Sequence, residues 1–162
     1  MLSRNDVQTA LKSLASRHGL DGLELDEHDS AVIEFGEDGA VIFEFREDDG
    51  ALTLWAPLCS LDFAETAEAE RRLLKGLLAL NFPGSRLRGA HVALNPETGI
   101  VLLSRPADFP PDQPDALTTL AQNFAVDVES ILGRLKDGSL LPDEAEELKL
   151  QSSAGVASFV RA

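Results

Sequence analysis

Apolar residues near the start of the chain recur at the spacing of an amphipathic α-helix. Ser3 precedes this stripe and Asp6 follows three residues later, as in a helix-capping box with aspartate in place of glutamate. Gly19 is a typical residue to end a helix, because glycine adopts the left-handed conformation without steric cost. The pattern predicts a first helix over residues 4–18, with an apolar stripe made of Val7, Leu11 and Leu14.

Three short runs rich in β-branched and aromatic residues follow this helix. They cover residues 31–35, 40–46 and 51–58, and acidic turns that contain glycine separate them. Short connections favour antiparallel neighbours, so we expect a meander of three strands.

Alternation along these strands divides their side chains between two faces of the sheet. The apolar sets that share a face are Ile33 with Phe35, and Val41 with Phe43 and Phe45. Trp55 faces away from Leu52 and Leu54 on its strand, and we expect it in the core rather than in a binding site. A groove between a helix and such a sheet could take an extended peptide, with main-chain pairing supplying affinity.

The stretch 73–82, LLKGLLALNF, is more apolar than a helix at the edge of a small domain needs to be. Its apolar band is wider than the ~100° stripe that usually packs against one core. We therefore expect a helix over about residues 65–81 that also contacts a second copy of the chain. The alternative is a helix sunk in one large core. The leucines of the band are Leu73, Leu74, Leu77, Leu78 and Leu80.

The remaining chain predicts a hairpin, a long helix and a tail. Strands are expected over residues 90–94 and 100–105, around the turn Asn-Pro-Glu-Thr-Gly, and an amphipathic helix over about 114–136. The element order α-β-β-β-α-β-β-α predicts an α+β fold, with three helices and an antiparallel sheet. We expect one domain over residues 1–138 and a C-terminal tail over 139–162.

The net charge of −14 is unevenly distributed. Residues 21–50 hold 12 of the 28 acidic residues and one basic residue, a net charge of −11. This argues against a nucleic-acid-binding protein, because phosphate backbones need clustered lysine and arginine. No apolar run approaches the ~20 residues of a membrane helix, and the first residues lack the apolar stretch of a secretory signal. With Cys59 as the one cysteine, an internal disulfide is excluded, and we expect a cytoplasmic protein without membrane contact.

Residues that carry chemistry do not form a known catalytic or metal-binding motif. His18, His28 and His91 lack metal-ligand spacing, and Cys59 has no second cysteine to share a zinc ion. No serine lies in a nucleophile motif, and no glycine-rich loop is arranged to cradle phosphate. We therefore expect no catalytic residues, no metal and no cofactor, and we do not expect an enzyme.

Three segments of the chain carry the local patterns of one known protein family. The first is residues 11–25, LKSLASRHGLDGLEL, a helix followed by a glycine break and Leu-x-Leu before an acidic stretch. The second is residues 73–82, where a leucine-rich helix ends in Leu-Asn. The third is residues 89–103, GAHVALNPETGIVLL, a strand, turn and strand. Together these segments resemble the class I type III secretion chaperones, the Tir-chaperone (CesT-like) family, and the likeness covers about residues 3–136.

The resemblance implies a homodimer that binds the N-terminal segment of a secreted effector in extended form and keeps it competent for secretion. By element, it implies dimer contacts from the middle helix and the strand after it, namely Leu73, Leu74, Leu77, Leu78, Leu80, Val92 and Leu94. It implies effector contacts from the first helix and the sheet, namely Val7, Leu11, Leu14, Ile33, Phe35, Phe43 and Phe45.

Two other functions remain open at this stage. One is a regulatory adaptor of the same fold that sequesters a transcription regulator, and the identity of a co-purified partner would distinguish it. The other is a small hydrolase or metal-dependent enzyme, which predicts a cleft with converging carboxylates or histidines.

Overall fold

The computed structural model describes residues 1–82 and 87–140, so nearly all of the predicted tail lies outside the described residues. The element order is the one predicted from the sequence, with a short 3-10 turn in addition. The elements are α1 (Arg4–His18), β1 (Ser30–Phe35), β2 (Gly39–Arg46), β3 (Ala51–Ser60), η1 (Leu61–Phe63), α2 (Ala67–Ala79), β4 (His91–Leu94), β5 (Ile100–Ala107) and α3 (Asp115–Lys136).

The five strands form one antiparallel sheet in the order β1-β2-β3-β5-β4, which confirms the predicted α+β class. Strands that follow each other in the sequence lie side by side where a hairpin joins them, in the meander β1-β2-β3 and in the pair β4-β5. In the β4–β5 turn, the N–H of Gly99 donates to the carbonyl oxygen of Asn95 (2.9 Å), and Gly99 has a φ of 66°. A left-handed glycine therefore closes this hairpin, as its sequence predicts.

The capping signals of α1 act as predicted. The Ser3 side chain accepts a hydrogen bond from the backbone N–H of Asp6, and the Asp6 carboxylate accepts one from the N–H of Ser3 (2.8 Å). At the other end, Gly19 is left-handed with a φ of 63°. By contrast, α2 is shorter than the predicted 65–81, because Thr66 serves as its N-cap and Leu80 as its C-cap.

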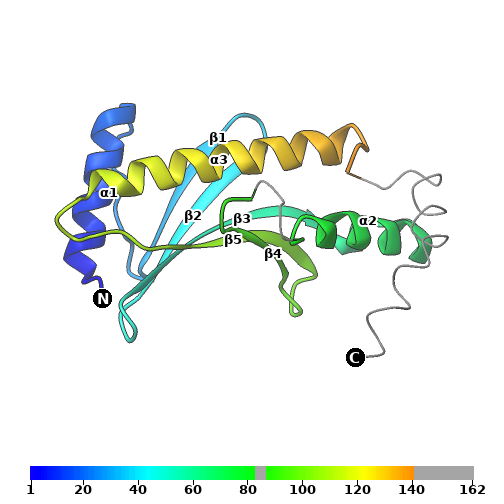
Figure 1. Ribbon diagram of the computed structural model, residues 1–162, viewed down its shortest axis with the longest axis horizontal. Helices are drawn as coiled ribbons and strands as arrows, with labels where there is room; N and C mark the ends of the chain where they lie inside the picture. The colour runs from blue at the N-terminus through cyan, green and yellow to red at the C-terminus, as the bar shows by residue number, and fades with distance from the viewer. Residues whose placement is uncertain (83–86, 141–162) are drawn as a thin grey trace, which may run out of the picture.

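Helix α3 lies along one face of the sheet, and α1 packs against α3 at one end of the molecule (Figure 1). The core between α3 and the sheet contains Phe124 and Val128 from the helix, with Phe43, Leu54 and Leu103 from the strands. Outside the core, Ser13 donates to Asp115 (2.6 Å) and Arg17 pairs with the same carboxylate. The end of the molecule that carries α1 is therefore closed by both apolar packing and ion pairs.

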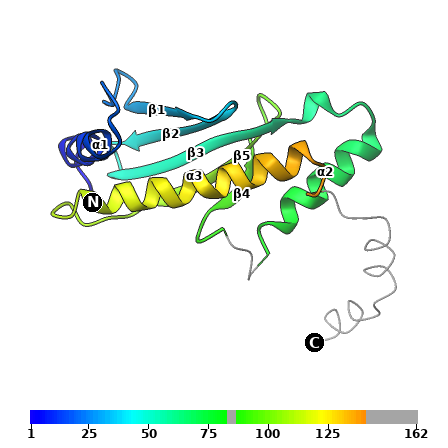
Figure 2. The same cartoon turned by 90° about the horizontal axis from the view of Figure 1, so that it is seen from above.

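Helix α2 lies at the opposite end of the molecule from α1, beyond the other end of the sheet (Figures 1 and 2). Its buried residues are Gly76 and Leu77 alone. The leucine-rich helix is therefore not sunk in a single core, the alternative considered from its sequence, and it presents much of its surface to solvent.

Candidate partner-binding surfaces

Helix α2 carries its leucines on more than one face. Leu77 is buried inside the protomer, whereas Leu78 is 61% exposed. Leu73, Leu74 and Leu80 are partly buried. The helix thus uses one side for its own protomer and leaves leucine surface on the other side.

The side of α2 that carries Gly76 is already covered by the end of the described chain. Leu140 is buried against it, and a Cβ atom on Gly76 would collide with the carbonyl oxygen of Leu140. Successive residues of a helix are about 100° apart around its axis, so Leu78 points away from the Gly76 side. The exposed and covered sides of α2 are therefore distinct.

Asn81 fastens the C-terminal end of α2 to strand β4. Its side-chain nitrogen donates to the carbonyl oxygen of Val92 (3.1 Å), and its side-chain oxygen accepts from the N–H of Val92 (2.7 Å). Val92 is buried, while Leu94 on the same face of β4 is 46% exposed and Phe82 is 73% exposed. We call Leu78, Phe82 and Leu94 the exposed α2–β4 residues. The Asn81 contact gives a physical role to the Leu-Asn ending of the helix.

The residues predicted to contact an effector divide into two groups. The first group lies in the protomer's own core and comprises Val7, Leu11, Leu14, Phe43 and Phe45. The second group, Ile33 and Phe35, is partly buried on β1, an edge strand of the sheet. Effector binding by these residues stays a prediction. For the first group it would require packed layers of the protomer to separate.

The sheet face that points away from this core carries an apolar row that the sequence pattern did not identify as a surface. Val32 pairs with Ile42 across β1 and β2, and Ile42 pairs with Trp55 across β2 and β3. Val32 is 53% exposed, and the other two are partly buried. The indole N–H of Trp55 donates to the carboxylate of Glu44 (3.1 Å). Trp55 therefore lies on a partly exposed face instead of in the core where we expected it.

Ion pairs compensate part of the acidic segment 21–50. From outside this segment, Arg4 pairs with Asp29 (2.6 Å), and Lys136 pairs with Asp38 (2.7 Å) in the β1–β2 turn. The hydrogen bond to Asp38 raises the pKa of Lys136. These contacts hold the ends of α1 and α3 to the acidic turns, and most of the remaining carboxylates of the segment face solvent.

Side chains that could bind a metal ion do not gather in the described part of the chain. Residues 1–82 and 87–140 contain no group of histidine, cysteine and carboxylate side chains arranged to hold a metal ion. Cys59 is partly buried, and this burial raises the pKa of its thiol. A thiol with a raised pKa is a weaker nucleophile at neutral pH. In these same residues, no helix is long and apolar enough to span a membrane.

Several solved structures share this fold. A chain of the ExsC–ExsE complex matches with a TM-score of 0.64 and 23% identity, over 89% of this chain and 99% of that one. A chain of the HopA1–SchA chaperone–effector complex matches with a TM-score of 0.59 and 14% identity, over 80% and 95%. The complex of the Yersinia pestis type III secretion chaperone SycH with a fragment of YscM2 contains a match with a TM-score of 0.55 and 14% identity, over 78% and 98%.

Sequence comparisons identify the family of this chain. A search of curated proteins found no match. A sequence model of the Tir chaperone protein (CesT) family matches residues 9–132, which is more than half of the chain and includes every described element except the ends of α1 and α3. The resemblance inferred from three short segments is thereby confirmed, and the chain belongs to the Tir chaperone protein (CesT) family.

Proposed function

We propose that this chain acts as a homodimeric type III secretion chaperone, which binds the N-terminal segment of a secreted effector in extended form and keeps it competent for secretion. The observation that carries the proposal is the exposed apolar surface of α2 and β4 in a chain of the CesT family. Among the described residues, no side chains are arranged to hold a metal ion, which the metal-dependent enzyme considered from the sequence would require.

The exposed α2–β4 residues support the dimer. Fully burying a leucine or phenylalanine side chain contributes about 1.5–3 kcal/mol, so leaving Leu78 and Phe82 in water forgoes a sizeable gain. A two-fold symmetric contact uses the same patch on both protomers, and each exposed residue is then buried twice. The Gly76 side of α2 already holds Leu140, which leaves the Leu78 side for a second protomer.

Strand β1 supports the binding of an extended segment. Within the described sheet it pairs with β2 alone, so its other edge offers unpaired backbone groups. A segment that adds as a further strand would gain main-chain hydrogen bonds and would lie beside Ile33 and Phe35. Ordering a disordered segment costs about 2–5 kcal/mol or more, and strand pairing with these apolar contacts offsets that cost.

One experiment tests both parts of the proposal. The chain is tagged and purified from its native cell, its mass is measured by light scattering, and bound polypeptides are identified by mass spectrometry after limited proteolysis. We expect a particle that contains two copies of the 17.4 kDa chain and a protected N-terminal effector segment. A lone 17.4 kDa particle without a partner would overturn the proposal. A bound regulator in place of an effector would favour the adaptor function.

A further inference from the structure

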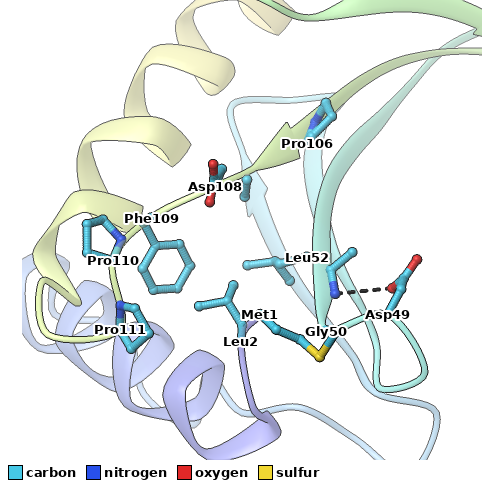
Figure 3. A pocket seen from close by; sticks show the side chains of 12 residues that line it. Met1, Leu2, Asp49, Gly50, Leu52, Pro106, Asp108, Phe109, Pro110 and Pro111 are labelled. Atoms are coloured by element: carbon cyan, nitrogen blue, oxygen red, sulfur yellow. Dashed lines mark hydrogen bonds between the residues drawn. The ribbon is translucent and has the colours of Figure 1, made fainter.

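A pocket of about 550 Å³ opens at the end of the molecule that carries α1 (Figure 3). Three segments distant in sequence form it: residues 1–2, the β2–β3 turn with the start of β3, and residues 106–111, which comprise the end of β5 and the segment that follows it. We call it the Phe109 pocket. Its volume lies within the ~300–1,000 Å³ range of ligand sites, and none of the predicted binding residues lines it.

The local sequence holds these segments in place. The N–H of Leu2 donates to the carbonyl oxygen of Gly50 (3.0 Å), and Gly50 has a φ of 59°. A side chain at Gly50 would strain the backbone and would crowd Leu2, so this close approach needs glycine. Pro106 lies on β5 beside β3, and Pro110 and Pro111 lie across the pocket from Gly50 (Figure 3). All three prolines restrict their own φ angles and carry no N–H. The pocket is therefore formed by a stiff frame before any ligand arrives.

The lining of the pocket combines apolar side chains with carboxylates. Leu2, Leu52 and Phe109 are buried apolar residues that converge on the pocket (Figure 3). Asp49 and Asp108 add two carboxylates, and the lining contains no lysine, arginine or histidine. Asp49 is already engaged, since it accepts from Arg46 (2.8 Å) and from the N–H of Ala51 (3.2 Å). Asp108 is exposed, and no hydrogen bond or ion pair joins it to another described residue.

We infer that the Phe109 pocket receives an arginine or lysine side chain of the bound partner segment. The aliphatic stem of such a residue suits the apolar floor, and its charged end would meet the carboxylate of Asp108. A chain with a net charge of −14 also attracts basic segments and repels acidic ones. This inference rests on the proposed function and adds a cationic anchor to the apolar and strand contacts.

The first test compares two charge reversals on the same proline-rich segment. Asp108→Lys places a cation at the pocket, whereas Asp112→Lys makes the same change of net charge at an exposed residue outside the lining. With the co-purified partner segment, we expect Asp108→Lys to raise the Kd roughly three- to tenfold and Asp112→Lys to change it less than about twofold. The difference should shrink at high salt. Equal effects of both variants would overturn the inference and leave the proposed function standing.

The second test needs no native partner, so it separates failure of the pocket from failure of the proposed function. The probes are the blocked dipeptides acetyl-Phe-Arg-amide and acetyl-Phe-Glu-amide, titrated into the full chain and followed by amide NMR. We expect the arginine probe alone to shift the amide signals of Gly50, Leu52 and Phe109, and Asp108→Lys to abolish these shifts. Absent shifts, or equal shifts with both probes, would overturn the inference. A bound effector together with that result would still support the chaperone function.

Discussion

Leucines on α1 and leucines on α2 follow the same helical spacing but end in different surroundings. Leu11 and Leu14 of α1 are buried, because α3 packs across them. Leu78 of α2 lies 61% exposed at the other end of the molecule, where no described helix covers it. An apolar stripe therefore predicts that something will pack against a helix. Whether the same protomer or a partner does so depends on the rest of the fold.

The two ends also differ in how their polar groups are used. Around α1, Arg4, Ser13 and Arg17 bind carboxylates from other elements, which closes this end within one protomer. At the end of α2, Asn81 binds the backbone of Val92 and thereby holds the helix to β4. The first arrangement fastens helices over a finished core, whereas the second fixes the position of a surface that remains open.

The largest expected effect is on stability, when a leucine is truncated to alanine at the α1 end of the molecule and, for comparison, at the α2 end. Leu11→Ala should lower the free energy of unfolding by about 2–5 kcal/mol, because it leaves a cavity at a fully buried site. Leu78→Ala should change it by less than about 0.5 kcal/mol in dilute protein. Denaturant unfolding at a fixed low concentration measures both values. Similar losses would mean that α2 is packed as tightly as α1.

The next effect concerns the oligomer and distinguishes two exposed apolar residues. Leu78→Asp should raise the dissociation constant of the proposed dimer by at least about a hundredfold, because each leucine contributes about 1.5–3 kcal/mol and the symmetric contact loses two of them. Light scattering across a dilution series measures this change. The matched control is Val126→Asp. Val126 is similarly exposed, at 55%, but lies on α3 and not on α2. Equal dissociation by both variants would reject α2 as the contact.

Sequence alone predicted the features whose causes lie within a few residues. The capping box of Ser3 and Asp6, the left-handed Gly19 and the Gly99 turn are local, and the structure confirms all of them. The element order followed from the same local signals together with the lengths of the connections. The resemblance to the family also rested on such short segments.

The same signals did not show which part of the molecule covers each face of the sheet. Alternation places Phe43 and Phe45 on one face and Ile42 on the other, but both faces carry apolar residues. The charged side chains of Glu44 and Arg46 share the face of Ile42 and indicate that it is the more exposed one. What covers the face of Phe43 depends on where α3 docks, which alternation within the strands does not specify. The Phe109 pocket was missed for a related reason, because three segments far apart in the chain meet only in the folded protein.

A smaller effect tests the link between α2 and β4. Asn81→Ala removes both hydrogen bonds to Val92 and leaves part-buried backbone groups without their partner, which should cost about 1–3 kcal/mol of local stability. The N–H of Val92 should then exchange with solvent several-fold faster. Asn81→Asp keeps the acceptor for that N–H and should show a smaller acceleration. Unchanged exchange in Asn81→Ala would indicate that α2 is held to β4 by apolar packing alone.

The smallest expected effect is a different response of the starts of α1 and α2 to acid. Hydrogen bonds from the Ser3 side chain and backbone lower the pKa of Asp6 below its ordinary value of 3.8. A carboxylate whose pKa is lower in the folded state stabilises that state above its unfolded pKa, and this contribution is lost as the pH falls through the lower, folded value. At the start of α2, the cap is the neutral hydroxyl of Thr66, which does not titrate. Acid should therefore weaken the capping hydrogen bond of α1 and leave that of α2 in place, whereas the carboxylate of Glu68 in the first turn of α2 also has a pKa lowered by its hydrogen bond to Arg71.

Asp6→Asn tests this difference. The variant should be less stable than the wild type near neutral pH, and the two should converge as the pH falls through the lowered pKa of Asp6, where the wild-type carboxylate becomes protonated. Glu129→Gln removes the same charge at an exposed site of α3 and should show no such convergence. Hydrogen exchange of the Val7 and Glu70 amides, which bond the capping residues Ser3 and Thr66, reports the two helix starts separately. If acid accelerated both amides equally, the acid response would be global and the cap of α1 would not explain it.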